Sequence, residues 1–430
     1  LYHLAHVYLY AVVYFEQDIA MERRSGNLEE AQRLYRNIAY NYWLLGEPMD
    51  AYSNAVRARD LLESGKLKEV KGSPSRIKVG LLGWYVPIPF IDLSKMGAIG
   101  GSAAFGFTTV EEKALVYTIL GNVLVESHRY EEAIQQNAKK LALYRRRKER
   151  LAEAAVLNNL GYLYLLKGDL ATAWRHFDRS YELCAKSKVV AGIAVNAINL
   201  GQLALLMSDP ALVDPAARRV SDALSYMSGQ SRVLVQRRVQ LLNLLGSLSL
   251  EGVAPAQVSA GLELTVHRSM ELLERAGYAQ TYFEEALRLS VERRLAREET
   301  VCRMNLARSW SVLGGWDRAA THLLQARRIC QLRGYSDLLW QVNESLGDLA
   351  SRLDERMRSS LRLNPAKAYF EEALSGLCAV SEAGITRVVL PMERTRHRRL
   401  YEHYAFHLAA LGDTLAALHV AEQLRAQLFL

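Results

Sequence analysis

The residues that could carry catalysis or hold a metal are scattered, and no enzyme motif brings them together. The chain lacks a His-Glu-x-x-His zinc motif, a Gly-x-Ser-x-Gly nucleophile elbow, a Walker phosphate loop and a paired Cys-x-x-Cys. His403 and His407 lie four residues apart and could share a helical face, but neither a third ligand nor a general base stands nearby. We therefore expect no catalytic, cofactor-binding or metal-binding residues and no enzymatic activity.

Amide side chains recur beside a repeated Leu-Gly or Leu-Ala pair. Asparagine directly precedes the leucine at three of these pairs, and an amide follows the glycine at two. The residues are Asn122, Asn159, Asn199, Gln202 and Asn305. Each amide can donate to a backbone carbonyl and accept from a backbone N–H, which suits an extended peptide. The alternative is structural, because the same amides could tie adjacent helices together.

The segments that carry these amides have the periodicity of paired helices. One face of the segment before Gly168-Asp169 has apolar or small residues three or four positions apart: Leu157, Leu160, Gly161 and Tyr164. After that break, Ala173 and Phe177 mark the contact face of a second helix. Glycine at 161 permits a close approach that a side chain would prevent. The pattern predicts a helical hairpin.

The same hairpin pattern recurs along the chain at nearly constant spacing. Anchor positions 121, 161 and 201 are 40 residues apart, the next follows after 45, and the last two are again 40 apart. The anchors are Leu120-Gly121, Leu160-Gly161, Leu200-Gly201, Leu245-Gly246, Leu306-Ala307 and Leu346-Gly347. The repeat signal fades between the fourth and fifth anchors, but the sequence there still predicts two helices, Leu262–Arg275 and Tyr282–Arg297. A fixed period of this kind predicts a solenoid.

The anchors resemble the tetratricopeptide repeat (TPR), with its pattern W-x2-L-G-x2-Y followed by A-x3-F. The chain keeps Leu160-Gly161 with Tyr164 and Ala173 with Phe177, and Leu157 stands at the tryptophan position. The resemblance implies an all-α right-handed superhelix of TPR-like hairpins, whose first helices line a concave groove. A period of 40 instead of 34 implies long helices. We divide the chain into N-terminal hairpins (1–71), an insertion (72–110) and a superhelical array (111–430).

The insertion is apolar and rich in glycine and proline. Its large apolar residues need cover or a partner, and Trp84, Tyr85 and Phe90 are added to the predicted binding residues. Two arrangements are open: the segment folds back along the array, which we favour, or it projects into a partner. Its unbroken apolar run, 79–91, is too short to span a membrane and contains two prolines.

The overall composition limits the class of partner. The net charge of +8 is spread along the chain, and its two basic clusters, 145–150 and 394–399, are mixed with acidic or aromatic residues. This disfavours nucleic acid as a partner. Four scattered cysteines are expected to be buried thiols in a reducing, cytoplasmic compartment.

The last helix carries the pattern A-E-x-x-R-A at Ala421-Glu422, Arg425 and Ala426. It is similar to the segment that joins TPR arrays to CHAT domains, which are caspase-like peptidase modules. The chain also stops inside a helical pattern, so we expect it to be a piece of a longer protein. The resemblance to TPR arrays implies a scaffold or adaptor that binds a protein or an extended peptide, within a larger complex. Two alternatives stay open: the regulatory array of a larger CHAT-type enzyme, and a nucleic-acid-binding helical repeat.

Overall fold

The computed structural model describes residues 2–64, 109–227, 232–251, 266–382 and 391–428. Every regular element in these ranges is a helix, as expected for an all-α solenoid. The helices form two compact units, Leu1–Ser187 with α1–α7 and Lys188–Leu430 with α8–α19. The predicted insertion lies between α3 and α4, and all but its last two residues fall outside the described ranges. Its packing, and the division at residues 72 and 110, stay predictions.

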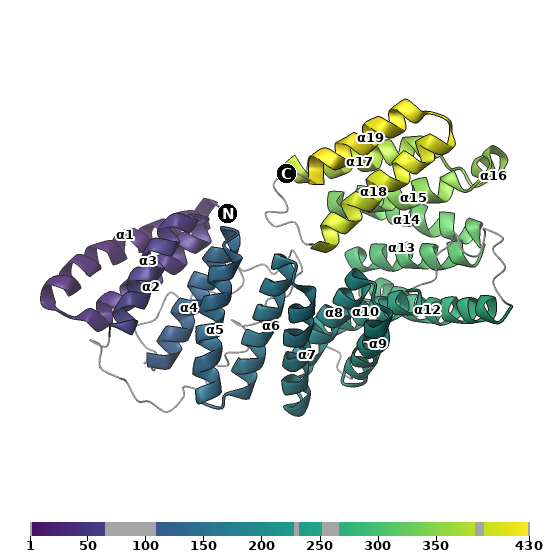
Figure 1. Ribbon diagram of the computed structural model, residues 1–430. Coiled ribbons are helices and arrows are strands. Elements are labelled where there is room, and N and C mark those ends of the chain that lie inside the picture. Colours follow the sequence, from purple (N-terminus) through teal and green to yellow (C-terminus); the bar gives the residue numbers. More distant parts are fainter. Residues whose placement is uncertain (1, 65–108, 228–231, 252–265, 383–390, 429–430) are drawn as a thin grey trace. The chain divides into compact units, whose positions relative to one another are not determined.

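The first unit is a row of antiparallel hairpins. In it α2 pairs with α3, α4 with α5 and α6 with α7, while α1 packs against α2 (Figure 1). Small and apolar residues from α2, α3 and α4 share one core, including Ile38, Ala55 and Leu120, each nearly or fully buried. The helix bounds are α1 (Tyr2–Ser25), α2 (Leu28–Leu45), α3 (Pro48–Glu63), α4 (Thr109–Glu126), α5 (Tyr130–Arg146), α6 (Arg150–Lys167) and α7 (Leu170–Lys186).

The turns between helices follow from the residues that the sequence places there. Gly168 ends α6 with φ of 87°, a left-handed conformation that glycine adopts without strain. Asp169 then caps α7, because its carboxylate accepts a hydrogen bond from the Thr172 backbone N–H at 3.0 Å. Pro48 stands in the first turn of α3, where its missing N–H leaves no bond unmade. The predicted break at Gly168-Asp169 is confirmed.

The anchor glycines face bulky side chains of a neighbouring helix. A Cβ atom at Gly161 would lie 2.7 Å from the ring of Phe177, which is fully buried in α7. Gly246 and Gly347 lie against Phe283 and Phe370 in the same way. Gly201 instead meets Leu244 of α10, the first helix of the next hairpin. The glycine therefore makes room for a side chain.

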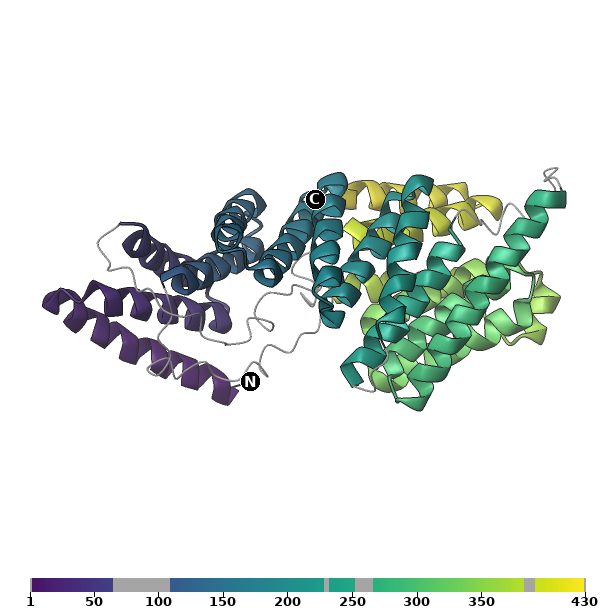
Figure 2. The ribbon, with the colours of Figure 1, turned by 90° about the horizontal axis from the view of Figure 1, so that it is seen from below.

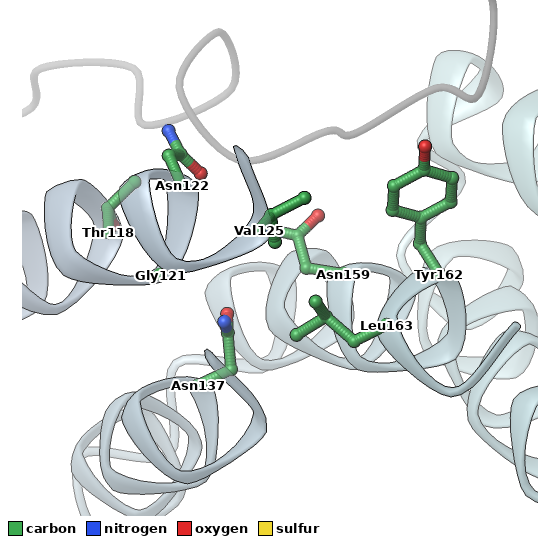
Figure 3. Close-up of a pocket in the computed structure, with 8 residues that line it drawn as sticks. All are labelled: Thr118, Gly121, Asn122, Val125, Asn137, Asn159, Tyr162 and Leu163. Atoms are coloured by element: carbon green, nitrogen blue, oxygen red, sulfur yellow. The ribbon is translucent and has the colours of Figure 1, made fainter. Parts of the chain in front are cut away.

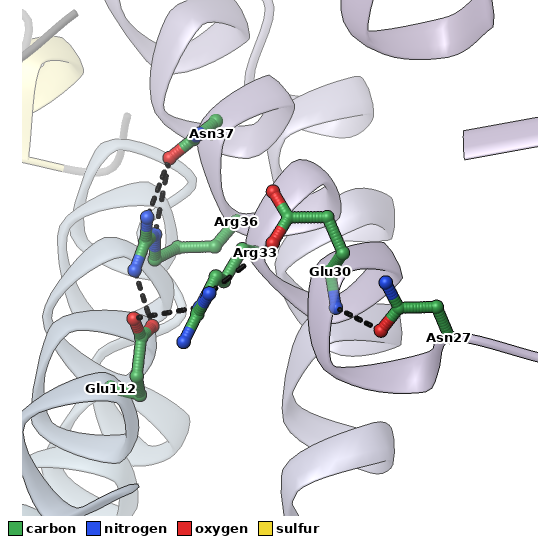
Figure 4. Close-up of polar contacts among 6 residues, drawn as sticks. All are labelled: Asn27, Glu30, Arg33, Arg36, Asn37 and Glu112. Atoms are coloured by element: carbon green, nitrogen blue, oxygen red, sulfur yellow. Dashed lines mark hydrogen bonds and ion pairs between the residues drawn. The ribbon is translucent and has the colours of Figure 1, made fainter. Parts of the chain in front are cut away.

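An ion cluster joins α2, which precedes the insertion in the sequence, to α4, which follows it (Figure 4). Arg36 and Glu112 are only 3% and 4% exposed, and the guanidinium of Arg36 donates to the Glu112 carboxylate. Arg33 lies 3.9 Å from the other oxygen of Glu112, and Asn37 accepts from Arg36 at 2.8 Å. Each buried charge is stable only while its partner is present. The cluster therefore fixes the pairing of these two first helices.

The second unit is also built from helical hairpins. Its pairs are α8 with α9, α10 with α12, α13 with α14, α15 with α17 and α18 with α19, the last drawn in yellow in Figures 1 and 2. The first helices α8, α10, α13, α15 and α18 also pack on one another in this order. The bounds are α8 (Val190–Met207), α9 (Pro210–Ser225), α10 (Arg232–Ser249), α12 (Val266–Glu292), α13 (Ala296–Val312), α14 (Trp316–Arg333), α15 (Ser336–Ser351), α16 (Glu355–Ser360), α17 (Ala366–Glu382), α18 (Pro391–Ala410) and α19 (Thr414–Leu428).

The six predicted anchors all lie in first helices. Their leucines, from Leu120 to Leu346, are at most 7% exposed. The prediction of two helices between the fourth and fifth anchors is wrong, because α12 is one helix of 27 residues. Gly277 lies within it and does not end it, since a helical glycine weakens a helix without breaking it.

One helix in the described part of the chain meets the length and hydropathy of a membrane span. It is α8, with 67% of its residues buried inside the unit. Its small and branched apolar residues, such as Ile193, Ala197 and Leu200, pack in the interior between neighbouring helices. Burial of this kind explains the apolar composition, because a helix that neighbouring helices cover on several sides carries apolar residues on those sides.

Candidate functional site: an amide notch on α4 and α6

A small hollow opens between α4 and α6 in the first unit, and we call it the amide notch. Asn122 of α4 and Asn159 of α6 stand at its edge with their side chains pointing the same way, and the Tyr162 hydroxyl points with them (Figure 3). Asn137 projects into the hollow from α5 (Figure 3). The lining residues are Thr118, Gly121, Asn122, Val125, Asn137, Asn159, Tyr162 and Leu163.

The repeat positions these polar groups. Asn122 and Tyr162 each follow an anchor glycine, while Thr118 and Asn159 lie one turn or less before one. The outer residues of the notch are therefore held by two consecutive first helices, and we call their exposed surface the first-helix face. Asn122 and Asn159 are partly exposed. Within the described residues, the Asn122 amide makes no hydrogen bond, so its donor and acceptor are open to a ligand.

Gly121 and Asn137 set the floor of the notch. The Asn137 amide donates to the Ala133 carbonyl at 3.0 Å and lies 3.0 Å from the place of a Gly121 Cβ. The cavity measures about 20 Å³, enough for one water molecule or one polar atom of a ligand. The notch can thus hold a single polar group beside the side chains of Asn122, Asn159 and Tyr162.

A buried lysine lies next to the notch. Lys140 of α5 is 5% exposed and donates from Nζ to the Thr118 hydroxyl at 2.7 Å. Burial lowers the pKa of Lys140 to about 8, because the charged form is poorly solvated there. The same hydroxyl donates to the Ala114 carbonyl at 2.7 Å. Lys140 therefore fixes the orientation of Thr118 and brings positive charge close to the site.

The predicted amides of the second unit have a different environment. Asn199 is 3% exposed, within the interior of α8, and Gln202 of the same helix is partly exposed. Asn305 of α13 donates to the side-chain oxygen of Asn243 in α10 at 3.0 Å. Asn243 in turn donates to the Val239 carbonyl at 3.1 Å. The geometry at Asn199 and Asn305 favours the structural alternative, whereas the open amide of Asn122 at the edge of the notch favours ligand binding. A binding role stays a prediction for all five amides.

The remaining predicted binding residues, Trp84, Tyr85 and Phe90, lie outside the described residues. Tyr162 and Thr118 were missed in the sequence. They occupy the places of Asn122 and Asn158 in the neighbouring repeat, so aligning the repeats by position could have found them.

The histidines and cysteines have structural surroundings in the described part of the chain. His403 Nδ1 lies 3.5 Å from Glu344, and His407 packs against the ring of Phe370. Burial lowers the pKa of both imidazoles. Among the described residues, no three His, Cys, Asp or Glu side chains gather as metal ligands would. Three cysteines are buried thiols as expected, but Cys378 is exposed on α17.

Each basic cluster contains arginines that pair with carboxylates. Arg145 binds Glu153 at 2.9 Å, and Arg398 binds Glu402 at 2.7 Å. Such pairs are typical of solvated helix surfaces.

Comparison with known proteins agrees with the hairpin geometry. Residues 112–186 match the family model described as the tetratricopeptide repeat. A search of curated proteins gave no match. Solved structures similar to the chain include a Rap protein complexed with competence and sporulation factor (11% identity, 98% of this chain and 97% of that one, TM-score 0.44). Apo RapI is another, with 11% identity over 86% of this chain and 99% of that one and a TM-score of 0.36. Yeast Tom70 is a third, with 14% identity over 97% of this chain and 89% of that one and a TM-score of 0.31. The match spans most of α4 and all of α5–α7, so the amide notch lies within TPR-type repeats.

Proposed function

We propose that this chain is a protein-interaction scaffold that binds an extended segment of a partner protein on its first-helix face. The observation that carries the proposal is the amide notch. Two consecutive repeats there direct partly exposed amides and a tyrosine hydroxyl to one side. Amides that both donate and accept can bond to any peptide backbone, while the notch admits one polar group.

The match of residues 112–186 to the TPR supports this proposal, because repeats of this type typically mediate protein interactions. The Rap structure is described as a complex with competence and sporulation factor. We infer a peptide-like ligand for this chain from the notch itself. Ion pairing within the basic clusters makes nucleic acid the weaker choice, since their charge is already neutralised in part.

The test begins with a peptide selected against the whole chain from a random display library. Asn122→Ala and Asn159→Ala should each weaken its binding by about 0.5–1.5 kcal/mol, the net value of one hydrogen bond. Gln135→Ala is the matched control, because Gln135 is an exposed amide on the second helix α5. Fluorescence anisotropy gives the three Kd values. Unchanged affinity in both asparagine variants, or an equal loss in the control, would refute the proposed site.

A further inference from the structure

Lys140 of α5 is a buried cation that no described carboxylate neutralises. It is 5% exposed, and the Thr118 hydroxyl is the one hydrogen-bond partner of its Nζ among the described residues. Burial lowers its pKa without a contribution from any charge in the described part of the chain. Arg36, which is equally buried, has Glu112 as its counter-charge. An ammonium can donate three hydrogen bonds, so Lys140 has donors left over.

Two features place this charge next to the amide notch. Thr118, which accepts a hydrogen bond from Nζ at 2.7 Å, lines the notch from α4. Asn137, which projects into the notch (Figure 3), precedes Lys140 by three residues, so the two lie on one face of α5. A ligand oxygen in contact with Thr118 would therefore lie about 5–6 Å from Nζ, roughly two hydrogen-bond lengths.

The walls of the notch leave this positive charge unopposed. The residues that line it are all neutral. Glu126, which follows the lining residue Val125, accepts a hydrogen bond from the Trp43 indole of α2 at 2.8 Å. Among the described residues, the ammonium of Lys140 is therefore the charge that a hydrogen bond joins to the wall of the notch.

The chemistry of the occupant follows from this arrangement. A buried ammonium is poorly solvated, and an incoming anion stabilises it. At about 5–6 Å in a partly buried site, an ammonium attracts a carboxylate strongly and gains much less from a neutral carbonyl group. The notch has room for one polar atom, which can be a carboxylate oxygen. The open amide of Asn122 at the edge of the notch can donate to the second oxygen.

We infer that the polar group held by the amide notch is a carboxylate, supplied by an Asp or Glu side chain of the bound segment, with Lys140 as its counter-charge. The occupant is argued from charge complementarity: a buried, unpaired cation beside a notch with neutral walls. The inference rests on the proposed function, because it names the class of segment that the notch takes. Lys140 acts on specificity, since its charge favours acidic segments over neutral ones.

The test compares the peptides that three chains select from one random display library, in which the peptides have no free C-terminus. The native chain should enrich Asp or Glu at one fixed position. Lys140→Met, which keeps the length of the side chain without its charge, should not. Lys139→Met is the matched control and should keep the enrichment, because Lys139 is the adjacent, exposed lysine of α5. Circular dichroism checks that each variant is folded.

Binding constants then measure the size of the effect. One acidic peptide selected by the native chain is synthesised with an amidated C-terminus, and a second version carries the matching amide in place of its acidic residue. By fluorescence anisotropy, the neutral version should bind the native chain about tenfold more weakly. Lys140→Met should bind the two versions with equal affinity, whereas Lys139→Met should discriminate between them as the native chain does.

Three results would overturn the inference. The native chain selects peptides without an enriched acidic residue, or Lys140→Met enriches acidic residues as strongly as the native chain. In the third, Lys139→Met loses the preference as fully as Lys140→Met, which would indicate diffuse attraction to a basic protein. In all three cases the selected peptides still report on the proposed function through Asn122→Ala. If the native chain selects no peptide at all, the proposed function fails together with the inference.

Discussion

Replacing Gly161 with alanine tests the close glycine–phenylalanine contact that Gly161, Gly246 and Gly347 share. The new Cβ would lie 2.7 Å from the Phe177 ring, whereas carbon atoms normally rest about 3.5–4.0 Å apart. Phe177 is fully buried, so its ring must move by roughly 1 Å in a close-packed interior. Overpacking of this kind costs about 1–3 kcal/mol. Alanine recovers about 0.5–1 kcal/mol through its helix propensity. We expect a net loss of about 0.5–2 kcal/mol.

Gly277→Ala is the matched control, because Gly277 lies within α12 and no atom stands within 4 Å of its added Cβ. It should stabilise the chain by about 0.5–1 kcal/mol. Repeat proteins do not unfold in a single step, so hydrogen exchange of α6 and α7 amides is the suitable measure. Adding Phe177→Leu to Gly161→Ala should reduce the cost of the alanine. If Gly161→Ala slows the hydrogen exchange of α6 and α7 amides as much as Gly277→Ala slows that of α12 amides, the close packing at Gly161 is refuted.

Three further predictions use the same measure. Glu112→Gln should destabilise the first unit by about 3–5 kcal/mol, because it leaves Arg36 buried without its counter-charge. Glu131→Gln is the control and should change the stability little, because Glu131 is exposed. Equal effects of the two variants would contradict a buried pair. Asn305→Ala should cost about 1–3 kcal/mol by leaving the Asn243 oxygen unsatisfied, without loss of peptide affinity. If affinity falls and stability does not, Asn305 belongs to the binding face. Lys140 has a pKa of about 8 in the folded chain, below the unfolded value of 10.5, so the unfolded chain binds more protons between these pH values. The free energy of unfolding should therefore rise with pH in this range. If the Lys140→Met variant shows a rise of the same size, Lys140 is excluded as its source.

The repeat architecture could be predicted from the sequence because the Leu-Gly and Leu-Ala anchors recur at regular intervals. The anchors recur after 40 or 45 residues except between Gly246 and Ala307. A large side chain packs beside the glycine, either in the same hairpin, as Phe177 beside Gly161, or in the next one, as Leu244 beside Gly201. The single helix α12 could not be predicted, since Gly277 and the fading anchors look like a break. Only tertiary packing decides whether a helix continues through a glycine.

The positions of the five amides beside the anchors could be predicted from the sequence, but their different surroundings in the two units could not. Asn159 and Asn305 hold the same place before an anchor leucine. Asn305 has Asn243 within reach on α10, whereas Asn159 stands at the edge of the amide notch. The contact of Asn305 depends on which residue the neighbouring first helix carries.

The central claim is that a peptide lies on the first-helix face, and site-specific photo-crosslinking tests it most directly. A benzophenone amino acid replaces Asn122 on α4 in one variant and Gln135 on α5 in another. Each is irradiated with the selected peptide, and mass spectrometry measures the crosslinked fraction. The account predicts a strong crosslink from position 122 that excess unlabelled peptide abolishes, and only background from position 135. A crosslink from position 135 as strong as that from position 122 would place the peptide elsewhere and contradict the account.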